Sequence, residues 1–287
     1  MAKKLDPRLN PVRPDLAGAE LKGRVEAQRF AEARPAQVAR GAVDLRRAPA
    51  ADAPLDSQLL AGEAVGIYEV ADGWAWVQSR ADSYMGYAAA DALREEQEAP
   101  SHWVKVPRTF VFPEPDEEAP PLDALSMTGR VRVTAEAGRF CELAGGGWVT
   151  GRHLAPLDTP AEDFVAVALQ FMGVPYLWGG KTSQGLDCSG LVQVALAAAG
   201  IAAPRDSDMQ AAGLGEARPL DAEPAHGDLI YLPSHVAIAL DRWRVVHANA
   251  HEMLVSIEPL DELVARVTKK YGQGITAVRR PPEGAGA

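Results

Sequence analysis

Cysteines, long apolar runs and metal-binding clusters are all scarce in this sequence. Only two cysteines occur in 287 residues, Cys141 and Cys188, so no disulfide framework holds the fold. No run of about 18 apolar residues occurs, so we expect no membrane-spanning helix. Because no group of histidines and cysteines has the spacing of a zinc site, we expect neither a metal nor any other cofactor.

Positive charge is also in deficit. The formal net charge is -10, which argues against nucleic acid as a partner. The first seven residues are basic but lack the apolar stretch of a secretion signal, and a Cys-x-Gly lipobox is absent. We therefore expect a cytoplasmic protein, a compartment in which a structural disulfide between the two cysteines is not expected.

The chain is long enough for two or three domains. Three prolines among the first 14 residues predict an extended arm that reaches about residue 18. Residues 19–33 are expected to form a short helix, although few of their positions are apolar. We assign residues 1–34 to this N-terminal arm and helix.

Short strand-like segments separated by turns begin at residue 35. Asp72-Gly73 predicts a hairpin, and the residues after it alternate between apolar and polar. Residues 100–157 repeat this texture more weakly, and Cys141 is expected in their core. The series Leu-x-Gly-Glu-x-Val, Gly-Trp-x-Trp-Val and Tyr-Met-Gly-Tyr resembles bacterial SH3-like domains. The resemblance implies a small β-barrel at 35–95, and we interpret residues 100–157 as a second one.

The hydrophobic period changes at residue 158. Thr159 is expected to cap a helix that has Pro160 in its first turn, and a polar loop is expected over 204–210. Strands are expected over 227–232, 235–240, 244–250, 255–258 and 275–280, with a short helix over 260–267. This order predicts an α+β domain, residues 158–287, in which helices precede a mostly antiparallel sheet.

Cys188 lies where a glycine-rich loop becomes a helix that ends at Gly200. Asp187 is the expected N-cap. The unpaired N–H groups of a first helical turn lower the pKa of a thiol and can stabilise an oxyanion, which favours a catalytic cysteine. The alternative is an inert buried thiol, the commoner fate of a lone cysteine.

A nucleophilic cysteine needs a base and a group that orients the base. Of the six histidines, only His235 and His247 lie in expected strands of the domain that holds Cys188. Neighbouring antiparallel strands can place these two imidazoles side by side, so one accepts the thiol proton and the other fixes its tautomer. The alternative is that both are ordinary sheet residues. His226 and His251 are expected at the surface.

Several segments in this domain resemble the NlpC-type peptidases. The segments are Pro-Tyr-x-Trp-Gly-Gly, Leu-Asp-Cys-Ser-Gly-Leu-Val, Pro-Arg-Asp-Ser-x-x-Gln, Gly-Asp-Leu-Ile and His-Val-Ala-Ile. The resemblance covers about residues 160–280 and implies a papain-like cysteine peptidase with the catalytic triad Cys188, His235 and His247. With the SH3-like domains in front, it is similar to the γ-D-glutamyl-L-diamino acid endopeptidases, also called dipeptidyl-peptidase VI. That implies hydrolysis after γ-D-Glu in a murein peptide whose L-Ala amine is free.

An ammonium group in a binding site needs an acidic or polar partner. Asp206 is the main candidate, and its alternative role is a turn former. An acidic residue of the first SH3-like domain is also implied, and Asp52 or Asp56 is the candidate. The resemblance further assigns substrate-binding roles to Tyr84, Tyr176, Asp187, Ser189 and Ser207.

Two other functions stay open. An amidase or acyltransferase would use the same triad, and a wall-peptide-binding adaptor would need no triad. The residues do not distinguish diaminopimelate from lysine as the diamino acid, and they do not give the oligomeric state.

Overall fold

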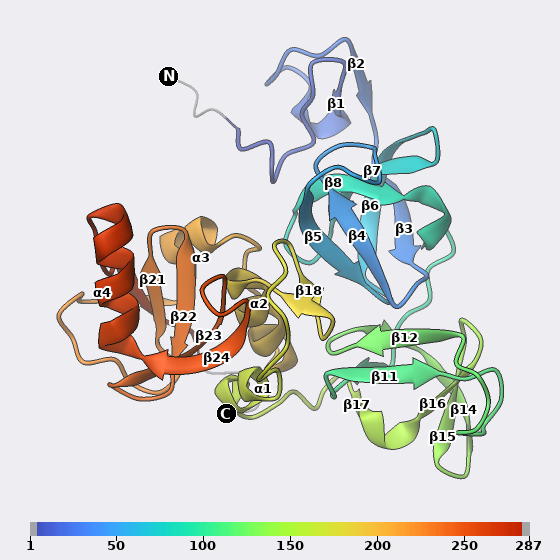
Figure 1. Cartoon of the computed structure of the whole chain (residues 1–287). Coiled ribbons are helices and arrows are strands. Elements are labelled where there is room, and N and C mark those ends of the chain that lie inside the picture. Colours follow the sequence, from blue (N-terminus) through green and yellow to red (C-terminus); the bar gives the residue numbers. More distant parts are fainter. Residues whose placement is uncertain (1–4, 283–287) are drawn as a thin grey trace. The chain divides into compact units, whose positions relative to one another are not determined.

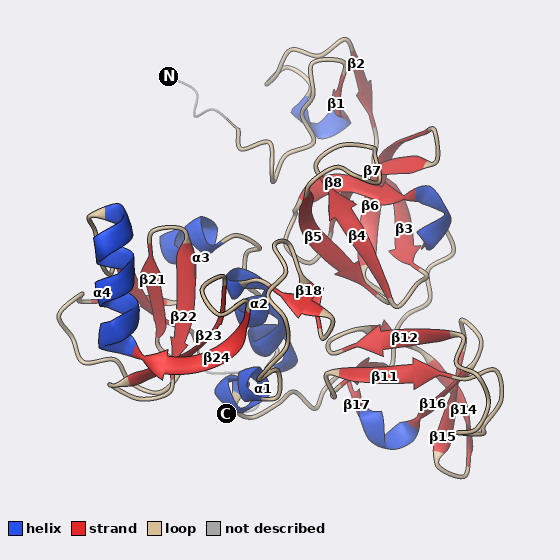
Figure 2. Cartoon of the chain, in the orientation of Figure 1, coloured by secondary structure: helices blue, strands red, loops and turns tan. Residues whose placement is uncertain are grey.

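The computed structural model describes residues 5–282. The chain divides into two compact units, residues 1–157 and 158–287, whose elements are labelled in Figure 1. Strands dominate the described residues and helices are few (Figure 2). No helix among residues 5–282 is long and apolar enough to cross a membrane.

The N-terminal segment of the first unit differs from its prediction. β1 (Leu16–Gly18) pairs in parallel with β2 (Arg29–Ala31), and only the 3-10 turn Ala19–Leu21 is helical. The helix predicted over 19–33 is therefore wrong. The segment has too few apolar residues to bury a helical face. Instead, Leu16 is fully buried and packs with Tyr68, Trp76 and Met85.

Residues 34–94 form a seven-stranded sheet with the strand order β5-β4-β8-β7-β6-β3-β9. The predicted hairpin is confirmed, because Asp72 and Gly73 join β6 to β7 with positive φ angles of 49° and 80°. Both central residues of a type I′ turn need such angles. The strands are β3 (Arg34–Val38), β4 (Ala42–Arg46), β5 (Leu55–Leu60), β6 (Ala64–Ala71), β7 (Trp74–Ser79), β8 (Met85–Ala89) and β9 (Leu93–Arg94), with a 3-10 turn at Ala90–Ala92.

Residues 102–156 form three small antiparallel sheets. Val104, Leu125 and Val149 belong to their shared core, and Cys141 packs against it, half-buried. A second barrel stays a prediction. The strands are β10 (His102–Val104), β11 (Arg108–Val111), β12 (Asp123–Ser126), β13 (Arg130–Val131), β14 (Val133–Ala137), β15 (Phe140–Leu143), β16 (Trp148–Thr150) and β17 (Leu154–Pro156), with a 3-10 turn at Gly151–His153.

The second unit combines helices with a six-stranded antiparallel sheet in the order β20-β25-β21-β22-β23-β24. The helices are α1 (Phe164–Leu169), α2 (Cys188–Ala198), α3 (Ser207–Gly213) and α4 (Leu260–Tyr271). The strands are β18 (Lys181–Thr182), β19 (Gly185–Leu186), β20 (Glu216–Arg218), β21 (Leu229–Leu232), β22 (His235–Ala239), β23 (Arg244–Asn249), β24 (Leu254–Pro259) and β25 (Ala277–Arg280).

Two local predictions in this unit are wrong. Asp163, not Thr159, caps α1, because its carboxylate accepts a hydrogen bond from the N–H of Val165 at 2.8 Å. The polar loop predicted over 204–210 ends early, since α3 begins at Ser207. Short helices with few apolar positions give a weak periodic signal, so the sequence of α3 does not distinguish a helix from a loop.

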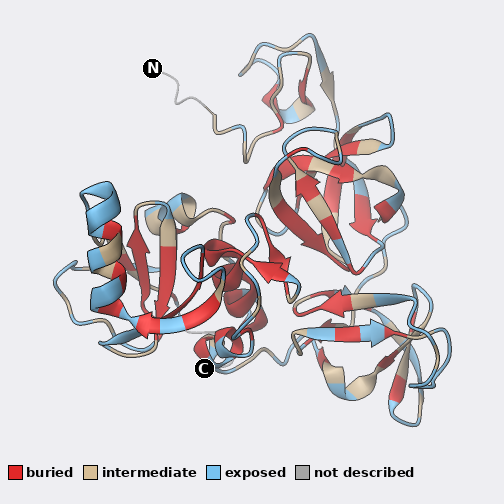
Figure 3. Cartoon of the chain, in the orientation of Figure 1, coloured by how far each residue is buried: buried red, intermediate tan, exposed pale blue. Residues whose placement is uncertain are grey.

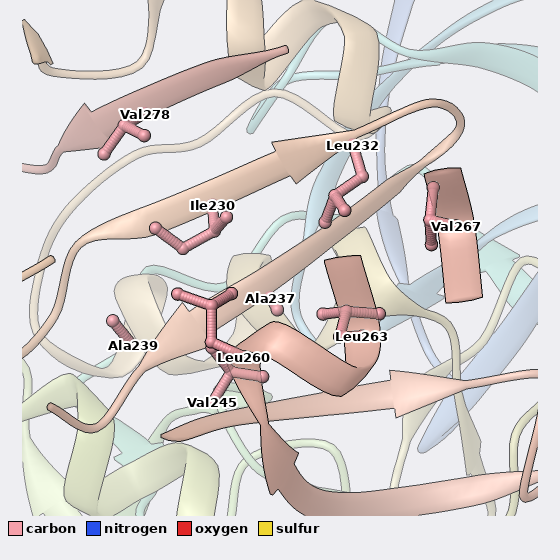
Figure 4. Packing of buried hydrophobic residues seen from close by; sticks show 9 residues of the cluster. All are labelled: Ile230, Leu232, Ala237, Ala239, Val245, Leu260, Leu263, Val267 and Val278. Atoms are coloured by element: carbon pink, nitrogen blue, oxygen red, sulfur yellow. The ribbon is translucent and has the colours of Figure 1, made fainter. Parts of the chain in front are cut away.

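Successive side chains along the central strands point alternately to the two faces of the sheet. One face, which includes Ile230, Ala237 and Val245, packs under α4 through Leu263 and Val267 (Figure 4). α2 lies against β22 and β23 and is buried along nearly its whole length (Figure 3). The start of α2 and the start of β22 are the elements that build the site described next.

Candidate active site

The N-terminus of α2 is fixed by Asp187. Its carboxylate accepts hydrogen bonds from the N–H of Gly190 at 2.7 Å and from the N–H of Gly179 at 2.9 Å. The predicted N-cap is therefore confirmed. A Cβ atom at Gly190 would lie 2.2 Å from the carbonyl oxygen of Gly180, so only glycine lets the loop approach the first turn this closely.

Arg205 holds Asp187 from the other side. Its guanidinium donates to both carboxylate oxygens, at 3.0 and 2.6 Å, and to the Ser189 hydroxyl at 2.9 Å. The Arg205 side chain is 1% exposed. Such a paired guanidinium–carboxylate contact has a defined geometry. Arg205 lies in one of the motifs of the sequence. Because it is 18 residues after Asp187, however, no neighbouring residue indicates that the two side chains form an ion pair.

The thiol of Cys188 is buried beside the start of β22. The backbone N–H of Val236, the residue after His235, donates a hydrogen bond to its sulfur. The prediction of a lowered thiol pKa is wrong for this structure. Burial, with the negative charge of Asp187 next, raises the pKa of Cys188 to about 12. Loss of solvation outweighs the favourable helix N-terminus.

The two imidazoles predicted to meet do so. His235 Nε2 lies 2.7 Å from His247 Nδ1, and the ring planes are 68° apart. Ala239 of β22 pairs with Val245 of β23. His235 lies four residues before Ala239, and His247 lies two residues after Val245. Both histidine side chains therefore project from the same face of the sheet. Burial lowers the pKa of His235 to about 4 and that of His247 to about 3. Both imidazoles are therefore neutral at pH 7.

The positive charge of Arg266 adds to the lowering of both imidazole pKa values. For His247, the neighbouring His235 contributes as well. Burial also raises the pKa of Tyr176, with the negative forms of Cys188 and Asp187 as further causes. This places Tyr176 in the same electrostatic environment as the thiol.

The remaining candidates lie in different places. Asp206 precedes α3 and Ser207 begins it, each half-buried, whereas Tyr84 is a buried residue of the first unit. Asp56 of that unit pairs with Arg47 at 2.6 Å, and Asp52 is exposed. His226 and His251 are exposed, as predicted, and His102 and His153 belong to the first unit.

The fold and the site together define a class of protein. Helices packed on an antiparallel sheet, with a cysteine opening one helix beside histidines of the sheet, are the architecture of papain-like cysteine peptidases. Within that class, residues 173–272 match the model of the NlpC/P60 family, and residues 45–93 match the bacterial dipeptidyl-peptidase SH3 domain. The chain therefore contains an NlpC/P60 domain and is a cysteine peptidase.

Several known proteins resemble the chain. Dipeptidyl-peptidase 6 of Lysinibacillus sphaericus is 27% identical over 71% of this chain and 73% of its own length. A γ-D-glutamyl-L-lysine dipeptidyl-peptidase of Bacillus subtilis is 33% identical, over 42% of this chain and 40% of its own. The crystal structure of an NlpC/P60 family protein from Bacillus cereus, 22% identical, superposes with a TM-score of 0.72 over 86% of this chain and 99% of its own. That similarity confirms the fold.

Proposed function

We propose that the protein is a cysteine endopeptidase that hydrolyses the bond between γ-D-Glu and a diamino acid in murein peptides. The peptide carries a free N-terminal L-Ala, and L-Ala-γ-D-Glu is released. The observation that supports this most directly is the 2.7 Å contact between His235 and His247, next to the Val236 N–H that binds the Cys188 sulfur. Relatives named for γ-D-glutamyl-L-lysine dipeptidyl-peptidase activity support the substrate class.

In the proposed reaction, Cys188 attacks and His235 moves the proton. Because the thiol pKa is raised and the imidazole pKa lowered, the resting pair is neutral, and the proton passes to His235 as sulfur attacks the γ-carbonyl carbon. The carbonyl electron pair moves to oxygen, where N–H groups at the start of α2 stabilise it. Collapse breaks the C–N bond, and His235 protonates the departing amine.

Water completes the proposed cycle. His235, neutral again, removes a proton from water as the water oxygen attacks the thioester carbon, and the thiolate leaves and is reprotonated. His247 orients His235 throughout through its 2.7 Å contact. The acyl product is L-Ala-γ-D-Glu, and the amine product begins with the diamino acid.

The substrate amine is assigned an acidic partner in this proposal. Asp206 supplies the carboxylate beside Ser207, both at the start of α3 in the catalytic unit. Buried ammonium groups need such compensation, which would make a free amine a condition of cleavage. Substrate-binding roles for Tyr84, Tyr176, Asp187 and Ser189 follow from the resemblance and stay predictions.

A capped substrate tests the proposal directly. The full chain is incubated with L-Ala-γ-D-Glu-diaminopimelate, with the lysine analogue, and with each peptide acetylated at L-Ala. Mass spectrometry should show L-Ala-γ-D-Glu from the free peptides, at least about 100-fold less from the capped ones, and none with Cys188→Ala. Equal cleavage of both forms would favour a general amidase. Binding without cleavage by the parent protein would favour an adaptor.

Asp206→Asn separates the amine-binding role from general damage. The substitution should raise KM for the free peptide about 10-fold or more and leave the small activity on the capped peptide unchanged. Asp208→Asn, an exposed position two residues further along α3, is the matched control. An equal loss of activity in both variants, or on both peptides, contradicts the assignment of Asp206.

The cellular role is part of the same proposal. A murein peptide with a free L-Ala amine has already been cut from the glycan, which fits recycling of wall peptides in the cytoplasm. Fractionation of cells that express the full natural gene tests this, with the protein expected alongside cytoplasmic markers. Recovery in the wall or in the medium would replace recycling with wall remodelling.

A further inference from the structure

One ring nitrogen of His247 is buried and has no hydrogen-bond partner among residues 5–282. Its other nitrogen, Nδ1, faces His235. A carboxylate oxygen of Glu258 lies 3.9 Å from the unpartnered Nε2. That distance is too long for a hydrogen bond and too short for a bridging water, so a small movement of either side chain would close the contact.

The sheet register places Glu258 on the same face as His247. On β24, Ser256 is the partner of His247 and Glu258 is the partner of Val245. Residues two apart on a strand share a face, so Glu258 is the diagonal neighbour of His247. Glu258 is itself buried, at 7% exposed. A carboxylate in such a position needs partners of its own.

Arg266 of α4 supplies those partners. One guanidinium nitrogen donates to both oxygens of Glu258, at 2.7 and 3.0 Å. α4 is held on this face of the sheet by Leu263 and Val267 (Figure 4). Arg266 directly precedes Val267 in the sequence. The position of the carboxylate is therefore set by the packing of α4.

We propose that Glu258, held by Arg266, is a positioning residue that keeps the hydrogen of neutral His247 on Nε2. The inference rests on the roles proposed above for the cysteine and the two histidines. With that hydrogen on Nε2, His247 Nδ1 accepts a hydrogen bond from Nε2–H of His235. The Nδ1 lone pair of His235 is then free to take the proton of Cys188.

The opposite tautomer would be unproductive. If His247 carried its hydrogen on Nδ1, it would donate to Nε2 of His235, and His235 would carry its own hydrogen on Nδ1. That nitrogen could not accept the thiol proton. A carboxylate is an acceptor only, so Glu258 favours the productive arrangement in which Nε2 is the donor.

The charges around the pair determine the expected pH behaviour. When the imidazolium forms, Glu258 stabilises it and Arg266 opposes it. From the α2 side, the negative Asp187 favours the imidazolium form of His235, and the thiolate of Cys188 is its counter-charge. Removing Glu258 should therefore make the thiolate–imidazolium pair harder to form, whereas removing Arg266 should make it easier.

The apparent pKa of Cys188 alkylation tests this without any peptide substrate. The full chain is treated with iodoacetamide across pH, and mass spectrometry of the peptides separates Cys188 from Cys141. Glu258→Gln should raise the apparent pKa by about 0.5–1 unit, and Arg266→Met should lower it by a similar amount. Glu262→Gln and Lys269→Met, exposed charges on α4, are the controls and should cause no shift.

Nitrogen NMR of the imidazoles supplies a second readout. The parent protein should show the hydrogen of His247 on Nε2, and Glu258→Gln should show a mixture of tautomers, with kcat reduced about 10-fold and KM little changed. A hydrogen on Nδ1 in the parent overturns the inference, as do shifts of the same sign in the two charge variants. Failure of murein peptides as substrates, with the alkylation shifts intact, overturns the proposed substrate alone.

Discussion

One ion pair from each unit shows two opposite environments for charged side chains. In the catalytic unit, the Arg205–Asp187 pair has exposed fractions of 1% and 10%. In the first unit, the Arg34–Glu95 pair has fractions of 55% and 68%. Exposed pairs contribute little to stability because water solvates both charges. The buried pair loses that solvation and depends on its own hydrogen bonds.

This difference indicates what the buried charges do. A well-packed apolar pair can replace a buried ion pair at no loss of stability, so stability does not explain the Arg205–Asp187 contact. The contact is one of several that meet at the start of α2, where Asp187 also binds the N–H groups of Gly179 and Gly190. The catalytic unit thus uses buried charge to fix the direction of a helix N-terminus beside the thiol.

Removing one partner from each ion pair should give the largest difference in stability between the two units. Arg205→Met should reduce the stability of the catalytic unit by about 3–5 kcal/mol, because the Asp187 carboxylate stays buried with fewer partners. Arg34→Met should cost less than about 1 kcal/mol. Hydrogen exchange of the full chain, compared for peptides from α2 and from β6–β7, measures both. Similar losses in the two variants would break the comparison.

Acid should affect the two units to different extents. The pKa values of His235 and His247 are lowered in the folded chain, so their stabilising contribution is complete above the unfolded value near 6.5 and is lost as pH falls toward 4. Each histidine should cost about 2 kcal/mol by pH 5. Exchange protection of α2 and β22, corrected for the intrinsic rate, should fall over this range.

The first unit supplies the contrast for the acid experiment. His153 is its histidine with a lowered pKa, caused mainly by burial. Strands β6 and β7 contain no histidine, so their protection should change little between pH 6.5 and 5. His235→Asn in the full chain should remove about half of the acid effect on α2. An unchanged slope in that variant would mean that buried carboxylates, not the imidazoles, cause it.

What the sequence predicts here depends on whether the signal is local. Asp187 and Cys188 stand at a change from turn formers to helix formers, so the cap and the thiol position were predictable. His235 and His247 were predictable as a pair because alternation places strand residues on faces. Arg205 was not identified, since its contact with Asp187 exists only after the loop before α3 folds back.

Burial and register explain the other failures. The helix N-terminus predicts a lowered thiol pKa, but the sequence does not show how completely the fold removes Cys188 from water. The sequence alone does not distinguish Glu258 from other strand residues. Only the register of β23 and β24 shows that it is the diagonal neighbour of His247. Weak apolar periodicity explains the wrong helix at 19–33, a segment in which only the turn Ala19–Leu21 is helical.

The smallest effects should come from two buried tyrosines, one in each unit. Among the described residues, the Tyr231 hydroxyl has no hydrogen-bond partner, and its side chain is almost completely buried. The Tyr68 hydroxyl of the first unit donates to Glu20 at 2.8 Å. Both side chains are buried. Substitution to Phe therefore removes a hydroxyl with a hydrogen-bond partner from Tyr68 and, from Tyr231, a hydroxyl without one among residues 5–282.

Tyr231→Phe should raise stability by about 1 kcal/mol, because an unsatisfied buried hydroxyl is removed. Tyr68→Phe should lower it by about 1 kcal/mol, since Glu20 loses its donor. Exchange of the full chain, read in β21 for the first variant and in β6 for the second, gives both values. Equal losses of stability in the two variants would show that internal water satisfies the Tyr231 hydroxyl. The network of buried polar groups at the start of α2 would then extend to β21.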